Sequence, residues 1–252
     1  ASAVAMDKLR TRQVLAAVGV PLPPAYAPER PLDCADASSE FAALQAAVGT
    51  PAFVKVDASG STVGVERITC QGDLERFFDA FRGRFRRWFG EREMRGEEIT
   101  VAVLGNTGGA LQALPPIGIY PRCDAWFTHE AKYTKGACDE VIPPRGLSSA
   151  QIEQVKALAV RCHEALVCDG MSRTDMIVTP QGPFVLETNT IPGLTSTSLL
   201  PQAAHAAGLS FPALLDRLLD LALARASGTA PESTAGPRRS EVPGGAASAA
   251  AR

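Results

Sequence analysis

The chain has 252 residues, of which 46% are hydrophobic and 21% charged, a composition typical of a globular protein with one large domain or two modest ones. A formal net charge of −2 and a pI near 6.0 leave no overall basic field, which argues against nucleic-acid binding driven by net charge. No apolar run approaches the roughly 20 residues that span a bilayer, so we expect no membrane association, and the start of the chain lacks the pattern of a secretory signal.

The first half of the chain alternates between helical and strand patterns. Apolar spacing predicts a first helix that Gly19 ends, and a later helix with an aromatic face. A polar, glycine-containing loop separates two short apolar stretches, which is typical of a β-hairpin. The expected helices are 6–18, 38–48 and 73–85, and the expected strands are 52–56 and 65–69.

The second half begins with strand patterns and ends with helices. The stretch 122–144 has no clear period, and a loop of that length inside a compact domain is usually functional or disordered. A strong helix follows, with Ser149 as its expected cap. The expected strands are 98–104, 111–114, 117–120, 171–178 and 184–189, and the expected helices are 148–166, 201–207 and 211–226.

The termini and the cysteines add two expectations. From Ser227 onward the chain is Ala, Gly, Pro, Ser and Arg with one large aliphatic residue, so we expect a disordered tail. The six cysteines form no CxxC or Cys/His zinc pattern, which favours reduced thiols and a cytoplasmic protein. The first residue is not Met, so the sequence is interpreted as a processed or truncated piece.

The most informative segment is the last predicted hairpin. Side chains two apart on a strand share a face, so Arg173 aligns with Asp175 and Glu187 with Asn189. A three-residue loop, 180–182, places Asp175 opposite Glu187 and Arg173 opposite Asn189, unless a bulge at the glycine shifts the pairing by one residue. Opposed carboxylates repel, and a divalent cation removes that objection. Arg173 suits a phosphoryl group or an oxyanion. The alternative is a solvated face with scattered charges.

Three further segments carry polar groups suited to anions. Lys55 ends a strand before the glycine-containing loop, whose backbone N–H groups can cover phosphates. The segment 190–198 is rich in hydroxyls and approaches a helix N-terminus, where anions bind. A Glu-Ala-Lys-Tyr string at 130–133 lies in the long loop and suits a lid. Taken singly, a hairpin turn, a helix-capping loop and exposed loop residues explain each of them.

In this order, the strings resemble the D-alanine–D-alanine ligase family of the ATP-grasp superfamily. They are AMDKLR (5–10), the Lys55 strand with SGSTVG (59–64), EITVAVLG (98–105), EAKY (130–133), SRTDMIV (172–178) and LETNTIPGLTSTSL (186–199). The resemblance covers residues 1 to about 225. It implies an α+β fold, with two subdomains of mainly antiparallel sheets that grip ATP. The expected boundaries are 1–96 for the small subdomain, 97–226 for the catalytic subdomain and 227–252 for the tail.

The resemblance also implies a reaction. Members of the family join two D-alanines for peptidoglycan, with ATP phosphorylating one carboxylate before the second amine attacks. The implied cofactors are ATP and two Mg²⁺, with Mn²⁺ as a substitute. The implied partners are ATP and D-alanine, with a homodimer or an N-terminal domain supplied in trans, since the family's N-terminal domain does not precede these strings.

Site residues carried over from the family fall on matching positions. The metal ligands are Asp175, Glu187 and Asn189. The catalytic residues are Arg173, the Gly193 N–H and Ser61. The second substrate would contact Lys132, Tyr133, Arg173, Gly193, Ser198 and Leu199. ATP would contact Lys8, Lys55, Ser59, Gly60, Ser61, Thr62, Glu91, Arg92, Met94, Glu98 and Lys132.

Two departures from the family pattern concern nucleotide binding. A glutamate expected in the phosphate loop is Ser59. The adenine-binding strand is usually an apolar run followed by Glu-Lys, and here Glu91 and Arg92 follow a poor apolar run at 86–90.

Three functions therefore remain open. The first is a ligase, for D-alanine or another amino-acid pair. The second is a degenerate ATP-grasp module that binds nucleotide without turnover. The third is nucleic-acid binding through the basic stretch 82–95, which a solvated face explains more simply.

Overall fold

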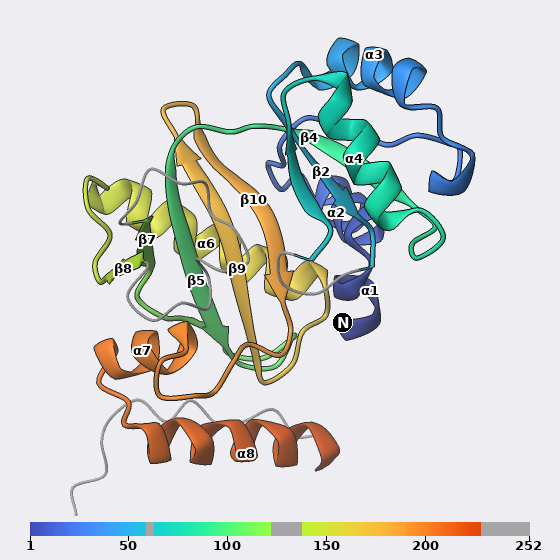
Figure 1. The fold of residues 1–252 in the computed structure, drawn as a ribbon. Coiled ribbons are helices and arrows are strands. Elements are labelled where there is room, and N and C mark those ends of the chain that lie inside the picture. Colours follow the sequence, from blue (N-terminus) through green and yellow to red (C-terminus); the bar gives the residue numbers. More distant parts are fainter. Residues whose placement is uncertain (59–62, 122–137, 228–252) are drawn as a thin grey trace, which may run out of the picture.

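The computed structural model describes residues 1–58, 63–121 and 138–227. Its smaller sheet is antiparallel, in the order β1-β4-β2-β3. Helices α3 and α4 cover one face of this sheet (Figure 1), and the core between them contains Leu44, Val54, Phe78 and Trp88. The strands are β1 (Ala25–Tyr26), β2 (Ala52–Val56), β3 (Val65–Ile68) and β4 (Trp88–Arg92), and the helices are α3 (Ala37–Val48) and α4 (Gln71–Phe81).

The larger sheet is also antiparallel, in the order β10-β9-β5-β7-β8, with β6 paired to β5. Helix α6 (Ser149–Ala165) packs on one face, and α7 (Leu199–Ala206) and α8 (Phe211–Ser227) cover the end of β5 (Figure 1). The strands are β5 (Glu97–Leu104), β6 (Gln112–Ala113), β7 (Ile117–Pro121), β8 (Cys138–Val141), β9 (Met171–Thr179) and β10 (Gly182–Asn189).

The N-terminal helices α1 (Ser2–Met6) and α2 (Lys8–Ala17) connect the two sheets, and a 3-10 turn, η1 (Leu32–Cys34), follows β1. Leu15 of α2 is buried in the core of the larger sheet, against α6. The backbone N–H of Lys8 donates to the carbonyl of Asp57, at the end of β2, at 2.9 Å. Helix α2 therefore contacts both halves of the molecule.

Most predicted elements are confirmed, and several details of the prediction are wrong. The first helix is broken at Asp7, because its extended backbone and its carboxylate cap α2 through the Arg10 N–H. The cap of α6 is Ser148, and α4 ends at Phe81. Strand β8 lies in the stretch for which no element was predicted, and 86–94 contains a regular strand, β4.

Strand β4 is regular because it is an interior strand. It lies between β1 and β2, so four consecutive residues are buried: Trp88, Phe89, Gly90 and Glu91. Its sequence therefore lacks the alternation of buried and exposed residues that marks a strand with one face in water. A Cβ at Gly90 would lie 2.2 Å from Leu44 Cδ1, so the glycine lets α3 approach the strand.

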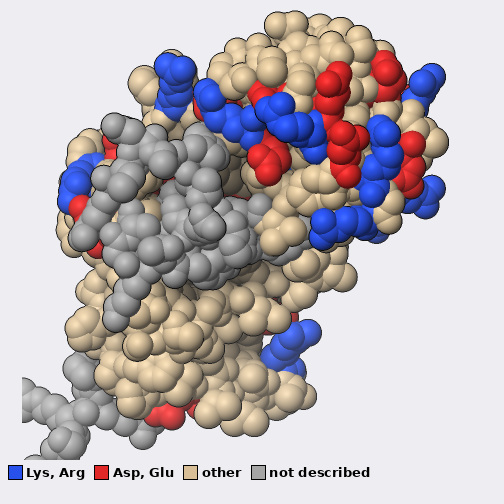
Figure 2. Space-filling view, viewed as in Figure 1, with Lys and Arg blue, Asp and Glu red and all other residues tan. Residues whose placement is uncertain are grey.

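On the face that Figure 2 shows, charged side chains of both signs are mixed over the smaller sheet and its helices, whereas the visible described surface around α7 and α8 is mostly uncharged. Helix α8 exposes a row of apolar side chains at helical spacing: Phe211, Leu215, Leu219 and Leu223. Among the helices of residues 1–58, 63–121 and 138–227, none combines the length and apolar character needed to cross a membrane. The predicted tail from residue 228 onward lies outside the described residues.

Candidate functional site

The β9–β10 hairpin has the predicted register at the site, although its turn differs from the prediction. Glu187 pairs with Asp175, and Asn189 pairs with Arg173. The turn has two residues, because Gly182 pairs directly with Thr179, and the register shifts at a bulge between Val185 and Glu187. The predicted three-residue loop is therefore wrong, and the extra residue is Leu186.

The bulge decides which way Glu187 points. Before it, Pro183 and Val185 are buried on the α6 side; after it, Thr188 takes the buried position and Glu187 and Asn189 are only partly buried. In a regular strand, Glu187 would share the face of Val185 and lie in the apolar core. The extra residue moves Glu187 to the face of Arg173 and Asp175.

Asp175 is the centre of the polar network on this face. It is 5% exposed, and both of its oxygens accept hydrogen bonds from Arg173, from Nε at 2.9 Å and from Nη2 at 2.7 Å. The Thr100 hydroxyl of β5 donates to Oδ1 at 2.6 Å, and the Asn189 amide donates to Oδ2 at 3.3 Å. Three strands thus hold one carboxylate in place.

Arg173 lies among several carboxylates. Burial lowers its pKa, but the charges of Asp175, Glu187 and Glu98, and its hydrogen bonds to Asp175, raise it overall. Glu98 belongs to this group because it is two residues from Thr100 on β5 and shares its face. The guanidinium therefore stays cationic at every physiological pH.

The smaller sheet contributes a second charged cluster, on the face opposite α3 and α4. Lys55 of β2 and Glu91 of β4 lie on this face, and Lys55 Nζ is 2.5 Å from Glu91 Oε2. Arg12 of α2 forms an ion pair with the other oxygen of Glu91. The side chains of Arg12, Lys55 and Glu91 are 15%, 13% and 3% exposed, so this triad is largely shielded from water.

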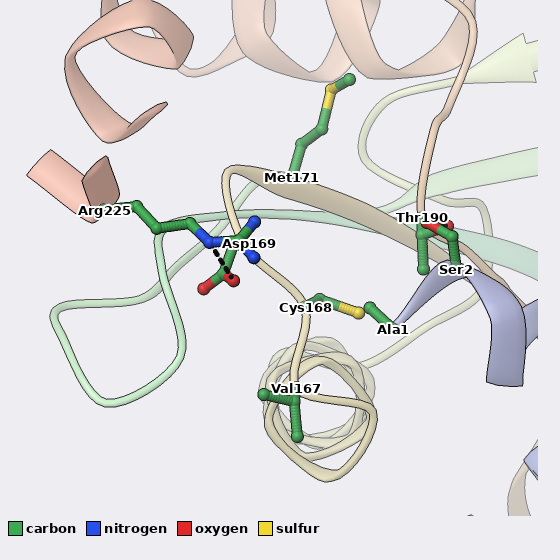
Figure 3. A pocket seen from close by; sticks show the side chains of 8 residues that line it. All are labelled: Ala1, Ser2, Val167, Cys168, Asp169, Met171, Thr190 and Arg225. Carbon is green, nitrogen blue, oxygen red and sulfur yellow. Dashed lines mark hydrogen bonds and ion pairs between the residues drawn. The ribbon is translucent and has the colours of Figure 1, made fainter. Parts of the chain in front are cut away.

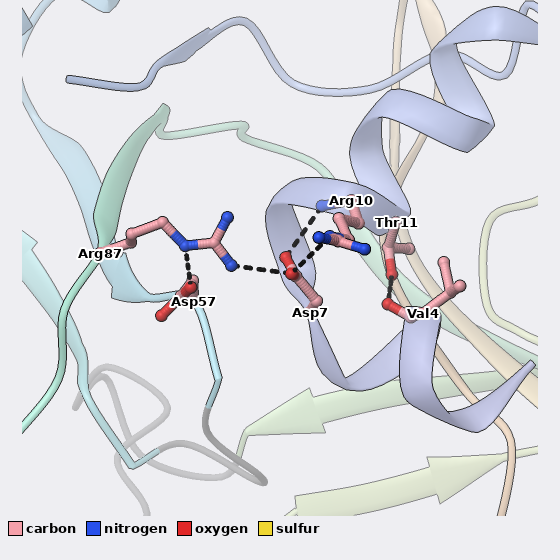
Figure 4. Close-up of polar contacts among 6 residues, drawn as sticks. All are labelled: Val4, Asp7, Arg10, Thr11, Asp57 and Arg87. Carbon is pink, nitrogen blue, oxygen red and sulfur yellow. Dashed lines mark hydrogen bonds and ion pairs between the residues drawn. The ribbon is translucent and has the colours of Figure 1, made fainter. Parts of the chain in front are cut away.

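Lys8 lies between the two clusters at the first residue of α2. Figure 4 shows how its helix is anchored: Arg87 Nη2 contacts Asp7 at 2.7 Å, and Arg87 Nε contacts Asp57 at 2.5 Å. Burial lowers the pKa of Lys8 below its usual value. The charge of Glu187 on the hairpin raises the pKa of Lys8 again, and the charge of Lys55 lowers it further. Lys8 therefore interacts electrostatically with groups on both sheets.

The remaining predicted residues fall into two groups. Ser59, Gly60, Ser61, Thr62, Lys132 and Tyr133 lie outside the described residues. Gly193 is exposed, and a Cβ there would lie 2.6 Å from Ser198 Oγ, so the backbone at Gly193 lies close to the Ser198 side chain. Ser198 is the N-cap of α7, which begins at Leu199. Arg92 follows Glu91 on the opposite face, where its Nε donates to the Val48 carbonyl of α3 at 2.9 Å. Met94 follows β4, in the connection to β5.

Sequence reasoning missed two residues that hold the site. Thr100 lies in the matched string EITVAVLG, and its alternation with Glu98 was the available signal. Arg12 lies one turn after Lys8 on α2, which places the two on one helix face.

Two hollows are lined by described residues outside these two clusters. An open groove of about 610 Å³ lies where the chain leaves β2, lined by Asp57, Ala58, Arg84, Phe85, Arg86 and Arg87. A smaller pocket of about 200 Å³ lies between the first residues, the end of α6 and the end of α8, where Arg225 pairs with Asp169 (Figure 3). None of the described residues that line the smaller pocket is a predicted site residue.

Comparison with known proteins gives one consistent answer. Residues 14–220 match the family model for the D-ala D-ala ligase C-terminus. A D-alanine–D-alanine ligase of Desulforudis audaxviator is 43% identical over 226 residues, covering 89% of this chain and 71% of that protein. The D-alanine–D-alanine ligase structure from Coxiella burnetii aligns with a TM-score of 0.73 at 30% identity, covering 90% of this chain and 60% of that one.

A Bacillus anthracis D-alanine–D-alanine ligase complexed with ATP aligns with a TM-score of 0.72 at 25% identity, covering 90% of this chain and 69% of that one. The chain thus spans between 60% and 71% of the length of these three relatives. Two antiparallel sheets with their helices, and this likeness, define an ATP-grasp protein of the α+β class. The chain belongs to the D-alanine–D-alanine ligase family of ATP-dependent ligases, enzymes that form a peptide bond.

Proposed function

We propose that this chain binds ATP between its two sheets and uses it to join two D-alanines, through an acyl phosphate, for peptidoglycan synthesis. The observation that carries the proposal is the pair of charged clusters, one on each sheet, with Lys8 interacting electrostatically with both. Lys55 lies on the smaller sheet, Arg173, Asp175, Glu187 and Asn189 share one face of the larger sheet, and Lys8 senses both through its charge interactions. Phosphoryl transfer needs this combination of positioning and positive charge.

Lys8 and Lys55 would bind the phosphates of ATP. Both are shielded from water, so their attraction to a phosphate is stronger than that of an exposed lysine. The residues 59–62, which follow β2, would cover the phosphates. Glu91, Met94 and Glu98 would contribute to nucleotide binding from β4, its connection and β5.

Arg173 would stabilise negative charge at the reacting carboxyl. Its two hydrogen bonds to Asp175 fix the guanidinium plane, so the remaining N–H groups point in a fixed direction without reorganisation. The exposed Gly193 N–H would be a second donor, and the Ser198–Leu199 start of α7 would bind the second substrate's carboxylate. Tyr133 and Lys132 would close over the substrates.

The donor set on the hairpin fits magnesium. Two carboxylates and an amide oxygen on one face are hard oxygen ligands. Asp175 is already oriented by Thr100 and Arg173, and Asn189 would present its oxygen by rotating an amide that now donates to Asp175. Asp175, Glu187 and Asn189 would hold two Mg²⁺, or Mn²⁺, and the ions would neutralise phosphate charge.

The proposal also covers the location of the protein, its assembly and its acceptor substrate. The protein would act in the cytoplasm, and a homodimer or an N-terminal domain supplied in trans would complete the binding of the first D-alanine. The acceptor is taken to be D-alanine; D-serine and D-lactate are the alternatives to assay beside it.

The test combines turnover with binding. ADP and D-alanyl-D-alanine are measured with Mg-ATP, with and without D-alanine, and nucleotide affinity is measured separately. We expect D-alanine-dependent ADP release, and we expect Asp175→Asn to abolish it while Arg161→Met, an exposed arginine on α6, leaves it unchanged. Nucleotide binding without D-alanine-dependent turnover would instead support the alternative of a nucleotide-binding module. Unchanged turnover in Asp175→Asn would discard the metal assignment.

A further inference from the structure

Arg12 belongs to the triad with Glu91 and Lys55 but has no role in the proposed function. Each oxygen of Glu91 contacts a different cation, Arg12 at Oε1 and Lys55 at Oε2. Arg12 is held firmly, because its Nη2 donates to the Pro23 carbonyl at 2.6 Å and its guanidinium lies 5.9 Å from the centre of the Phe89 ring. Lys55 lies at the penultimate position of β2, two residues before the Asp57–Ala58 step.

The triad sets a condition on nucleotide binding. Glu91 is 2% exposed, so a carboxylate there without a cationic partner is strongly unfavourable. When Lys55 turns its charge toward a phosphate, its attraction to Glu91 weakens. Glu91 tolerates this because Arg12 remains on its other oxygen.

We infer that Arg12 is a positioning residue for ATP: it is the permanent partner of Glu91, and it thereby frees Lys55 to exchange Glu91 for phosphate. The inference rests on the proposed function, in which Lys55 binds phosphate. Without Arg12, the ion pair with Lys55 is the one that remains of the two described for Glu91, so Lys55 is held on Glu91 and the phosphate site loses one of its two lysines. Arg12 itself faces the Pro23 carbonyl and the Phe89 ring.

The test is a double-mutant cycle on the full 252-residue chain, with dissociation constants for Mg-ATP and for adenosine measured by calorimetry. Arg12→Met should weaken ATP binding by about 10- to 100-fold, because Lys55 is then held in its buried ion pair with Glu91 and is not available to the phosphate. Adenosine, which carries no phosphate, should bind with an unchanged constant. Arg12→Lys should recover most of the affinity for ATP, and Arg161→Met should change neither constant.

The decisive arm is Arg12→Met combined with Glu91→Gln. Once Glu91 is neutral, Lys55 is no longer trapped, so Arg12→Met should cost less than about threefold relative to Glu91→Gln alone. An equal loss of ATP affinity with and without Glu91 would overturn the inference, as would equal losses for ATP and adenosine, which indicate a merely structural role. Parent protein that does not bind ATP at all would refute the proposed nucleotide site, and this inference with it.

Discussion

Replacing Asp175 with asparagine tests the electrostatics of the hairpin independently of any ligand. The change leaves the shape nearly unaltered but removes the negative charge that both Nε and Nη2 of Arg173 contact. The side chain of Arg173 is only 20% exposed and that of Asp175 7%, so the guanidinium loses its main counter-ion in a poorly hydrated place. We therefore expect a loss of stability.

The magnitude follows from the surroundings of Arg173. Breaking a fully buried pair costs about 3–5 kcal/mol. Glu187 and Glu98 still act on Arg173, and part of its side chain reaches water, so we reduce the expected cost to about 2–3 kcal/mol. For a protein of this size that corresponds to a fall in Tm of roughly 4–12 °C.

The assay is urea unfolding at pH 7 for the parent, Asp175→Asn, Arg173→Met and the double variant. The double variant should lose less than the sum of the two single losses, because neither charge then remains unpaired. Asn189→Ala is the matched control and should cost under about 1 kcal/mol, since it removes a single 3.3 Å hydrogen bond. Asp175→Asn with the stability of the parent would refute the assignment of Asp175 as the counter-ion of Arg173.

Three more predictions concern the scaffold. Asp73 accepts hydrogen bonds from the Thr69 hydroxyl and from the N–H groups of Thr69 and Cys70, and these bonds lower its pKa to about 2 although burial opposes the shift. Asp73→Ala should therefore cost about 1 kcal/mol in urea unfolding at pH 7. This difference from the parent should vanish as the pH falls from 3.8 through 2, where Asp73 becomes protonated in the folded protein as well. Burial lowers the pKa of His163 below its ordinary value of 6.5, so the unfolded chain binds a proton more readily than the folded protein. The free energy of unfolding should therefore fall as the pH drops below 6.5. His163→Gln should flatten that part of the stability–pH curve, and an unchanged slope would contradict the reasoning. A Cβ at Gly96 would lie 2.1 Å from the Val178 carbonyl oxygen, so Gly96→Ala should destabilise by about 1–3 kcal/mol, whereas Gly72→Ala in α4, with only ordinary contacts, should be neutral or stabilising; equal Tm values for the two would count against the close approach.

The sequence by itself determined the local elements and much of the site. Alternation predicted the two strands of the hairpin and the shared face of Arg173 and Asp175, because these depend on neighbours along the chain. The order of the strings predicted the family. The residues 59–62 and 130–133, and every assignment of a role to a site residue, stay predictions.

Only the tertiary structure decided the contacts that join distant segments. The hairpin register came out as predicted although both its turn and its bulge differ, since the extra residue Leu186 compensates for the shorter turn. The strand character of β4 is visible only once β1 and β2 flank it, and the pairing of Arg12 with Glu91 needs α2 to lie across the sheet. Such features arise from burial and from side chains tens of residues apart, which neither periodicity nor spacing records.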